Sequence, residues 1–222
     1  MKALTIKALA GLLYIFIAVS ALIFLPAWTL NYWQAWLYLA VFLISISAVF
    51  IYLIRYDPEL LARRINNKEE SRKQKVIHFS INLAFAAVIV IPALDHRFGW
   101  STVPWEIVAL GDVGVALGIL LIFFVFRENS FTAATIEVVA DQKVISTGPY
   151  AFVRHPMYVG GLVFILGIPL ALGSWWGLLM VVLFAPILVW RILDEEKFLV
   201  KNLSGYSEYE DKVKYRMIPL VW

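Results

Sequence analysis

A series of apolar stretches, each close to the length needed to cross a lipid bilayer, constrains this chain most. A transmembrane helix needs about 20 predominantly apolar residues. The apolar segments are at about residues 8–25, 35–54, 76–94, 105–126, 157–172 and 175–193. The mean hydropathy is +0.80 and 62% of the 222 residues are hydrophobic, which exceeds the usual composition of a soluble domain. The sequence therefore predicts an all-α integral membrane protein with about six transmembrane helices.

The distribution of positive charge predicts how these helices are oriented. Cytoplasmic loops of membrane proteins carry an excess of lysine and arginine. With six crossings, Arg97 is the single one of the 19 Lys and Arg residues that falls on the side opposite the termini. We therefore expect both termini, the 55–75 loop and the 127–156 loop to lie in the cytoplasm.

The last two apolar segments, separated by Gly173-Ser174, should form a helical hairpin whose two ends return to the cytoplasmic side. Segment 157–172 has 16 residues, and at about 1.5 Å per residue it is short of a bilayer core of about 30 Å. Its first residues should therefore lie below the membrane surface, in a cytoplasmic pocket.

We divide the chain into residues 1–126, with four membrane spans, and residues 127–222, with a long polar connection, the hairpin and a cytoplasmic tail. In the first region, residues 58–65 can form an amphipathic helix on the membrane surface, as an anchored loop or as a gate over a site. Gly111, Gly114 and Gly118 lie on nearly one helical face, which permits close helix packing.

Several kinds of chemistry are excluded or unsupported. The absence of cysteine excludes disulfides, thiolate metal sites and a cysteine nucleophile. The three histidines are too scattered to indicate a metal site, and no Gly-x-Gly-x-x-Gly turn supports a Rossmann cofactor site. The net charge of +3 is small and does not indicate a nucleic-acid partner.

Two groups of charged residues border the predicted hairpin. Arg154 and His155 precede Pro156, a residue suited to the first helical position, where unpaired N–H groups favour an anion. At the other end of the hairpin, Arg191 and Glu195 are four residues apart and share one helix face. They could be a membrane anchor and a helix-end ion pair, or the two walls of a functional site.

The order of motifs in the last third of the chain resembles the isoprenylcysteine carboxyl methyltransferase family. The motifs are Gly148-Pro149-Tyr150, Arg154-His155-Pro156-Met157-Tyr158-Val159-Gly160, Arg191 to Glu195-Glu196, Tyr206 to Tyr209, and Arg216-Met217-Ile218-Pro219. The resemblance covers about residues 128–219. It implies a membrane methyltransferase that uses S-adenosyl-L-methionine, reached from the cytosol, and a lipid-like acceptor that comes from the bilayer.

The resemblance also implies roles for individual residues. It assigns substrate contact to Arg191, and Arg154 is a second catalytic candidate. Glu195 matches the glutamate that holds the cofactor, although a one-residue difference in spacing leaves Glu196 as an alternative. Gln142 stands where the family has histidine. The other implied cofactor contacts are Lys143, Val144, Ile145, Tyr150, His155, Pro156, Met157 and Tyr158.

These residue types suit the cofactor and the reaction. A glutamate can bind the amino group, the Arg154–His155 helix start the carboxylate, and tyrosines the adenine or the sulfonium. If the acceptor is a carboxylate, no base is needed and Arg191 could orient it. If the acceptor is an amine, His155 or a glutamate would be the base.

Three alternatives stay open at this point. Sterol reductases, which use NADPH, share a related C-terminal pattern, as do phospholipid N-methyltransferases. A non-catalytic membrane protein could keep the same fold. The expected partners are the bilayer and a lipid-like or small methyl acceptor, and the sequence does not indicate an oligomeric state.

Overall fold

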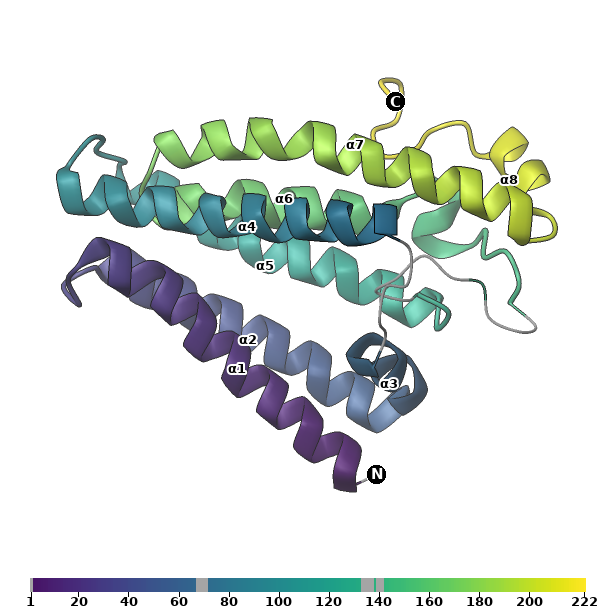
Figure 1. Ribbon diagram of the computed structural model, residues 1–222, viewed down its shortest axis with the longest axis horizontal. Coiled ribbons are helices and arrows are strands. Elements are labelled where there is room, and N and C mark those ends of the chain that lie inside the picture. The colour runs from purple at the N-terminus through teal and green to yellow at the C-terminus, as the bar shows by residue number, and fades with distance from the viewer. Residues whose placement is uncertain (1, 67–71, 133–137, 139–141) are drawn as a thin grey trace.

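The computed structural model describes residues 2–66, 72–132, 138 and 142–222, and within these ranges it consists of helices and connecting segments (Figure 1). In chain order the helices are α1 Lys2–Ala27, α2 Trp33–Tyr56, α3 Pro58–Asn66, α4 Arg72–Phe98, α5 Trp105–Glu128, the 3-10 helix η1 Gly148–Ala151, α6 Pro156–Ala171, α7 Trp176–Asn202 and α8 Tyr206–Lys212. The predicted all-α class is confirmed.

Each of the six predicted apolar segments lies mainly within one helix. Five helices, α1, α2, α4, α5 and α7, are long and apolar enough to cross a membrane. The sixth, α6, has 16 residues and so extends over about 24 Å. Large apolar side chains cover the outer faces of these helices; Ile44, Leu110 and Leu183 are each more than 60% exposed. The chain is therefore a multi-pass integral membrane protein.

Two helices extend beyond the apolar segments read from the sequence. The first helix does not stop before Pro26 but includes it in its last turn. The last membrane helix continues through the acidic residues that follow Leu193 and ends at Asn202. The cause is the same in both places: apolar length marks the part of a helix that is in lipid, whereas the helix ends where its hydrogen bonds end.

Helices α5 and α6 pack with their backbones in close approach, as the glycines of α5 predict. A Cβ atom on Gly111 would lie 2.2 Å from the backbone nitrogen of Ala171, and one on Gly118 would lie 2.4 Å from that of Phe164. Gly167 of α6 meets the backbone of α5 in the same way, because an added Cβ there would lie 2.7 Å from the nitrogen of Val115. Side chains at these positions would force the two helices apart.

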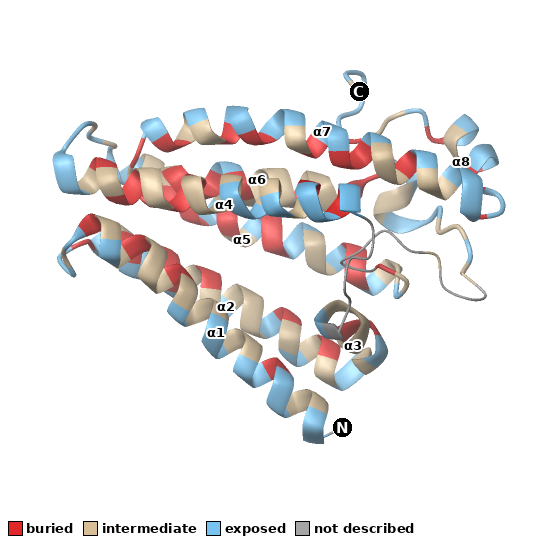
Figure 2. Cartoon of the chain, in the orientation of Figure 1, coloured by how far each residue is buried: buried red, intermediate tan, exposed pale blue. Residues whose placement is uncertain are grey.

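Figure 2 shows buried residues concentrated on the facing surfaces of α4, α5, α6 and α7. Helices α1 and α2 run side by side at an angle to these four, and α3 and α8 lie at the end of the molecule where α7 ends (Figure 1). The turns between α1 and α2, α4 and α5, and α6 and α7 lie at the opposite end. The predicted hairpin of the last two membrane segments is therefore present, and both of its ends are near α8.

A buried polar cluster fixes the turn of this hairpin. Asp95 of α4 is 1% exposed and accepts hydrogen bonds from the hydroxyl groups of Ser101 and Ser174, each at 2.5 Å. The hydroxyl of Tyr32 donates to the carbonyl of Leu172 at 2.5 Å. The cluster joins the α4–α5 link and the start of α2 to the α6–α7 turn, so it holds α7 in register with the other helices.

Candidate functional site

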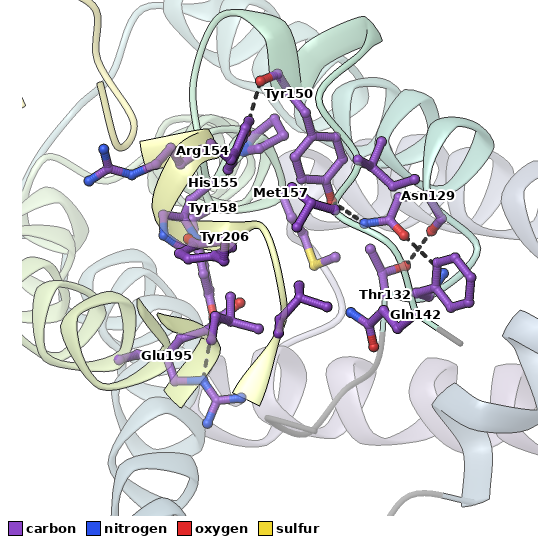
Figure 3. A pocket seen from close by; sticks show the side chains of 18 of the residues that line it. Asn129, Thr132, Gln142, Tyr150, Arg154, His155, Met157, Tyr158, Glu195 and Tyr206 are labelled. Carbon is purple, nitrogen blue, oxygen red and sulfur yellow. Dashed lines mark hydrogen bonds between the residues drawn. The ribbon is translucent and has the colours of Figure 1, made fainter. Parts of the chain in front are cut away.

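The two ends of the hairpin meet in one cavity of about 360 Å³. Tyr150 and the segment 154–158 form part of its wall, and Arg191 and Glu195 of α7 form another part. The size is within the range of small-molecule sites. In Figure 3, Tyr158, Tyr206 and Glu195 lie on one side, Asn129, Thr132 and Gln142 on the other, and Met157 points between them.

The start of α6 is held in the cavity wall by local sequence. Pro156 occupies the first turn of α6 and His155 is its N-cap residue. The 3-10 helix η1 begins at Gly148, which has a φ of +55°, and Pro149 is its second residue. The positive φ favours a glycine here, and a Cβ at this position would lie 2.7 Å from the carboxyl group of Glu128, which would have to move.

Twelve of the thirteen residues proposed from the sequence line this cavity. They are Gln142, Lys143, Val144, Ile145, Tyr150, Arg154, His155, Pro156, Met157, Tyr158, Arg191 and Glu195. Glu196 is not among the lining residues. The structure therefore separates the two adjacent glutamates that the sequence left as alternatives, although the roles proposed for all thirteen residues stay predictions.

Glu196 is the centre of a buried ionic network instead. Its carboxylate accepts hydrogen bonds from Nε of Arg154 at 2.8 Å and from Nε of Arg216 at 2.7 Å, and Nε2 of His155 lies 3.2 Å away. The side chains of Arg154 and Glu196 are each 6% exposed. Arg154 also donates to the carbonyl groups of Val213 and Lys214. Because its guanidinium is engaged in this way, Arg154 supports the cavity wall more than it offers charge to a ligand.

The C-terminal tail completes this part of the wall. The backbone N–H groups of Arg154 and His155 donate to the carbonyl groups of Tyr215 and Arg216, at 2.9 and 2.8 Å. The tail therefore holds the segment before α6 through both backbone bonds and the Glu196 network.

Arg191 and Glu195 do not form the helix-end ion pair that their spacing allowed. The hydroxyl group of Tyr158 lies between them: it donates to Oε2 of Glu195 at 2.6 Å and accepts from Nε of Arg191 at 3.3 Å. Arg191 is 4% exposed, and its Nη1 donates to Oε1 of Gln74 in α4. Each charged group is thus fixed by neutral partners and keeps its charge for a ligand.

Tyrosines form much of the remaining wall. The hydroxyl of Tyr150 accepts a hydrogen bond from Nδ2 of Asn129 at 3.1 Å, and its carbonyl accepts one from the hydroxyl of Tyr209 at 2.8 Å. Burial raises the pKa of Tyr150, Tyr206 and Tyr209 above the ordinary value of a phenol. These groups are therefore neutral at physiological pH and can stack on a planar or cationic ligand.

Other lining residues carry no motif that the sequence revealed. They include Arg64 of α3, His78 and Ile81 of α4, and Asn129, Phe131 and Thr132 after α5. The predicted amphipathic helix is present as α3, and its Arg64 reaches the cavity, as a gate over a site would require. The amphipathic pattern of α3 was the sequence signal that could have identified Arg64. The residues of α4 gave no such signal, because they belong to an ordinary apolar segment.

The lining charges define what the cavity can bind. Glu195 is the one carboxylate among the described lining residues, and it faces a wall that also contains Arg64, Lys143, Arg154 and Arg191. Such a site suits a ligand with an amino group, a carboxylate and an aromatic ring. No group of three or more potential metal ligands occurs in the part of the chain that the structure describes.

Parts of this chain are similar to known membrane enzymes. The family described as Phospholipid methyltransferase matches residues 107–205. A Protein-S-isoprenylcysteine O-methyltransferase of Schizosaccharomyces pombe is 37% identical over 87 residues, which are 36% of this chain and 35% of that protein. The Delta(14)-sterol reductase TM7SF2 of Mus musculus is 33% identical over 105 residues, which are 44% of this chain and 25% of that protein.

The fold has a solved counterpart over nearly its whole length. The structure of a eukaryotic intramembrane Ras methyltransferase, isoprenylcysteine carboxyl methyltransferase, matches 96% of this chain and 86% of its own, with a TM-score of 0.55 and 17% identity. This likeness concerns the fold. The matched region spans about a third and a quarter of the lengths of the two curated relatives.

The fold and the cavity define a class of multi-pass, all-helical membrane proteins with a polar cavity where the hairpin α6–α7 returns to one end of the bundle. Within that class, the matching family, the isoprenylcysteine O-methyltransferase relative and the solved structure of similar fold are all described as methyltransferases. The chain is thus similar to membrane methyltransferases over residues 107–205, and it shares its fold with an isoprenylcysteine carboxyl methyltransferase.

Proposed function

We propose that this protein transfers a methyl group from S-adenosylmethionine to the carboxylate of a lipid-like acceptor, such as a prenylated cysteine. The observation that carries the proposal is the position of Glu195, the one carboxylate among the described lining residues of a tyrosine-rich and otherwise cationic cavity. The family match at residues 107–205 supports methyl transfer, and the isoprenylcysteine O-methyltransferase relative supports an oxygen acceptor.

The residues of the cavity fit this donor by chemical type. Glu195, aligned by Tyr158, would bind its amino group through a charge-assisted hydrogen bond. The segment 142–145 would bind through its backbone, and Tyr150 would stack on the adenine or face the sulfonium. When bound, S-adenosylmethionine supplies a methyl group on a positively charged sulfur, which a nucleophile can displace directly.

Arg191 would orient the acceptor. A guanidinium binds a carboxylate through two parallel N–H groups, which aligns the attacking oxygen without removing a proton. A carboxylate is already ionised at neutral pH, so this reaction needs no general base. The protein's contribution is then alignment and the exclusion of water.

We further propose that the cavity opens to the cytoplasm and that the acceptor reaches it from the bilayer. The positive-inside rule supports this orientation, because Arg97 alone among the 19 Lys and Arg residues is on the opposite side when all six segments cross. An acceptor with a long apolar chain would partition into the membrane and present its polar end at this level.

The test is transfer of radiolabelled methyl from S-adenosylmethionine by protein in lipid nanodiscs, with an S-prenylated cysteine and a phosphatidylethanolamine as separate acceptors. Label in the prenylated cysteine supports the proposal, and label in the phospholipid alone assigns an N-methyltransferase. Arg191→Ala should abolish turnover, whereas Glu208→Gln, an exposed change on α8, should not alter it. Absence of label in both acceptors would contradict methyl transfer.

The similarity to a Delta(14)-sterol reductase favours a second candidate, an NADPH-dependent reduction in the same cavity. The cationic lining would suit the phosphates of such a cofactor. Loss of NADPH absorbance in the presence of a sterol, without methyl transfer, would select this candidate. Stable NADPH absorbance together with labelled acceptor would reject it.

A further inference from the structure

One buried polar side chain beside the cavity belongs to no recognised motif. Gln74 lies in the first turn of α4 and is 4% exposed. Its Oε1 accepts a hydrogen bond from Nη1 of Arg191, and its Nε2 donates one to Oδ2 of Asp194. Lys73 forms an ion pair with the same aspartate. A neutral amide of α4 therefore lies between a cation and an anion of α7.

Without this amide the two charges would be close enough to pair. Arg191 and Asp194 are three residues apart on α7, and side chains at this spacing are neighbours on one helix face. A primary amide accepts from a guanidinium through its oxygen and donates to a carboxylate through its nitrogen. Leucine can do neither, and glutamate would bind the guanidinium but repel Asp194.

Arg191 is separated from its second neighbouring carboxylate in the same way. The hydroxyl of Tyr158 lies between Arg191 and Glu195 and is hydrogen-bonded to both. Nη2 of Arg191 has no hydrogen-bond acceptor among the residues that the structure describes, and the side chain lines the cavity. The guanidinium is therefore buried, fixed by two neutral groups, and not neutralised by either carboxylate.

We propose that Gln74 is a positioning residue that keeps Arg191 apart from Asp194 and so directs its guanidinium to the acceptor carboxylate. The inference rests on the proposed function, in which Arg191 binds that carboxylate. It adds a specificity element on α4, a helix with no recognised motif: an anionic acceptor is selected because the cation that receives it has no protein carboxylate as its partner.

Steady-state kinetics of Gln74→Leu and Gln74→Glu test this role, with S-adenosylmethionine and a soluble S-prenylated cysteine. A charge-assisted hydrogen bond corresponds to a change of about tenfold to a hundredfold in an equilibrium constant. We expect Gln74→Leu to raise the KM for the acceptor by about this factor. Gln74→Glu should raise it as well, because its carboxylate neutralises Arg191. The Kd for S-adenosylhomocysteine should be unchanged in both.

A rescue experiment distinguishes positioning from simple loss of packing. In Gln74→Leu/Asp194→Asn the competing carboxylate is removed, so the acceptor KM should return towards the wild-type value. A structural defect would not be rescued in this way. Gln34→Leu, the same change at a half-buried position near the opposite end of the bundle, is the matched control and should leave the acceptor KM unchanged. Equal KM values for the single and double Gln74 variants would overturn the inference.

The position of Arg191 provides a readout that needs no turnover. In a cryo-EM structure of Gln74→Leu without ligand, the guanidinium of Arg191 should pair with Asp194. A guanidinium that stays on Tyr158 would overturn the inference. If Arg191 moves as expected in Gln74→Leu but the wild-type protein transfers no methyl group, the proposed function is overturned and the positioning role of Gln74 is not.

Discussion

Replacement of Glu196 by glutamine should strongly destabilise the protein, even though Glu196 does not line the cavity. Its carboxylate accepts hydrogen bonds from Arg154 at 2.8 Å and Arg216 at 2.7 Å, and it lies 3.2 Å from Nε2 of His155. The glutamine has the same size but lacks the negative charge and directs an NH2 group at one of these donors. The change therefore removes the nearest negative charge from Arg154, which keeps only the longer contact of 3.6 Å with Glu210.

The expected loss can be estimated from burial. Removing one member of a buried ion pair costs about 3–5 kcal/mol, because the remaining charge is uncompensated. Arg154 has a side chain that is 6% exposed, and Glu210 remains 3.6 Å from it, so the lower end of this range, about 3 kcal/mol, applies. The side chain of Arg216 is 29% exposed, so water screens its share to below about 1 kcal/mol. A total of about 4 kcal/mol corresponds to a fall of about 8–16 °C in Tm for a chain of this length.

Thermal unfolding in detergent, followed by the fluorescence of the nine tryptophans, measures this shift. Glu195→Gln is the matched variant one residue away; its partner is the neutral hydroxyl of Tyr158, so its Tm should stay near that of the wild type. Glu208→Gln, an exposed change on α8, controls for loss of one negative charge. Equal Tm values for Glu196→Gln and Glu195→Gln would refute the reasoning.

Two further predictions concern the helix contacts that place the cavity. Gly118→Ala should lower the Tm or prevent folding, because its Cβ would lie 2.4 Å from the backbone nitrogen of Phe164, and overpacking costs about 1–3 kcal/mol or more. Gly161→Ala, where nothing lies within 4 Å of the added Cβ, should leave the Tm near the wild-type value; equal shifts would contradict the close α5–α6 contact. Ser174→Ala should cost about 1–3 kcal/mol, because Asp95 loses a buried hydrogen bond. An unchanged Tm for this variant would show that the hairpin turn is held by other contacts.

The membrane helices could be predicted because their signal is local. An apolar run of bilayer length is read within one segment, and all six segments lie mainly within helices of the structure. The ends of the helices were harder to predict from the sequence. The last turns of α7 are polar and extend to Asn202, beyond any apolar run. This extension carries the cavity residue Leu199, and the cavity residue Leu203 follows directly after it.

The residues of the candidate site could be predicted where they belong to a motif. Residues that reach the site from distant helices could not be predicted in this way. Adjacent residues of a helix point about 100° apart, so Glu195 and Glu196 must face different surroundings. Which of them faces the cavity depends on how α7 packs against α6 and the tail, and a sequence pattern does not show that packing. Arg64 and Gln74 are more than a hundred residues from Arg191 in sequence, and they reach the cavity region through helix packing alone.

The most direct test of the account is calorimetric titration of the purified protein with S-adenosylhomocysteine. The wild type should bind one equivalent. Glu195→Gln should weaken binding by about tenfold or more, since a charged hydrogen-bond partner of the amino group is lost. Glu208→Gln should bind as the wild type does. Binding that is undetectable in the wild type at millimolar ligand, or unaltered in Glu195→Gln, would contradict the claim that this cavity is the site of the methyl donor.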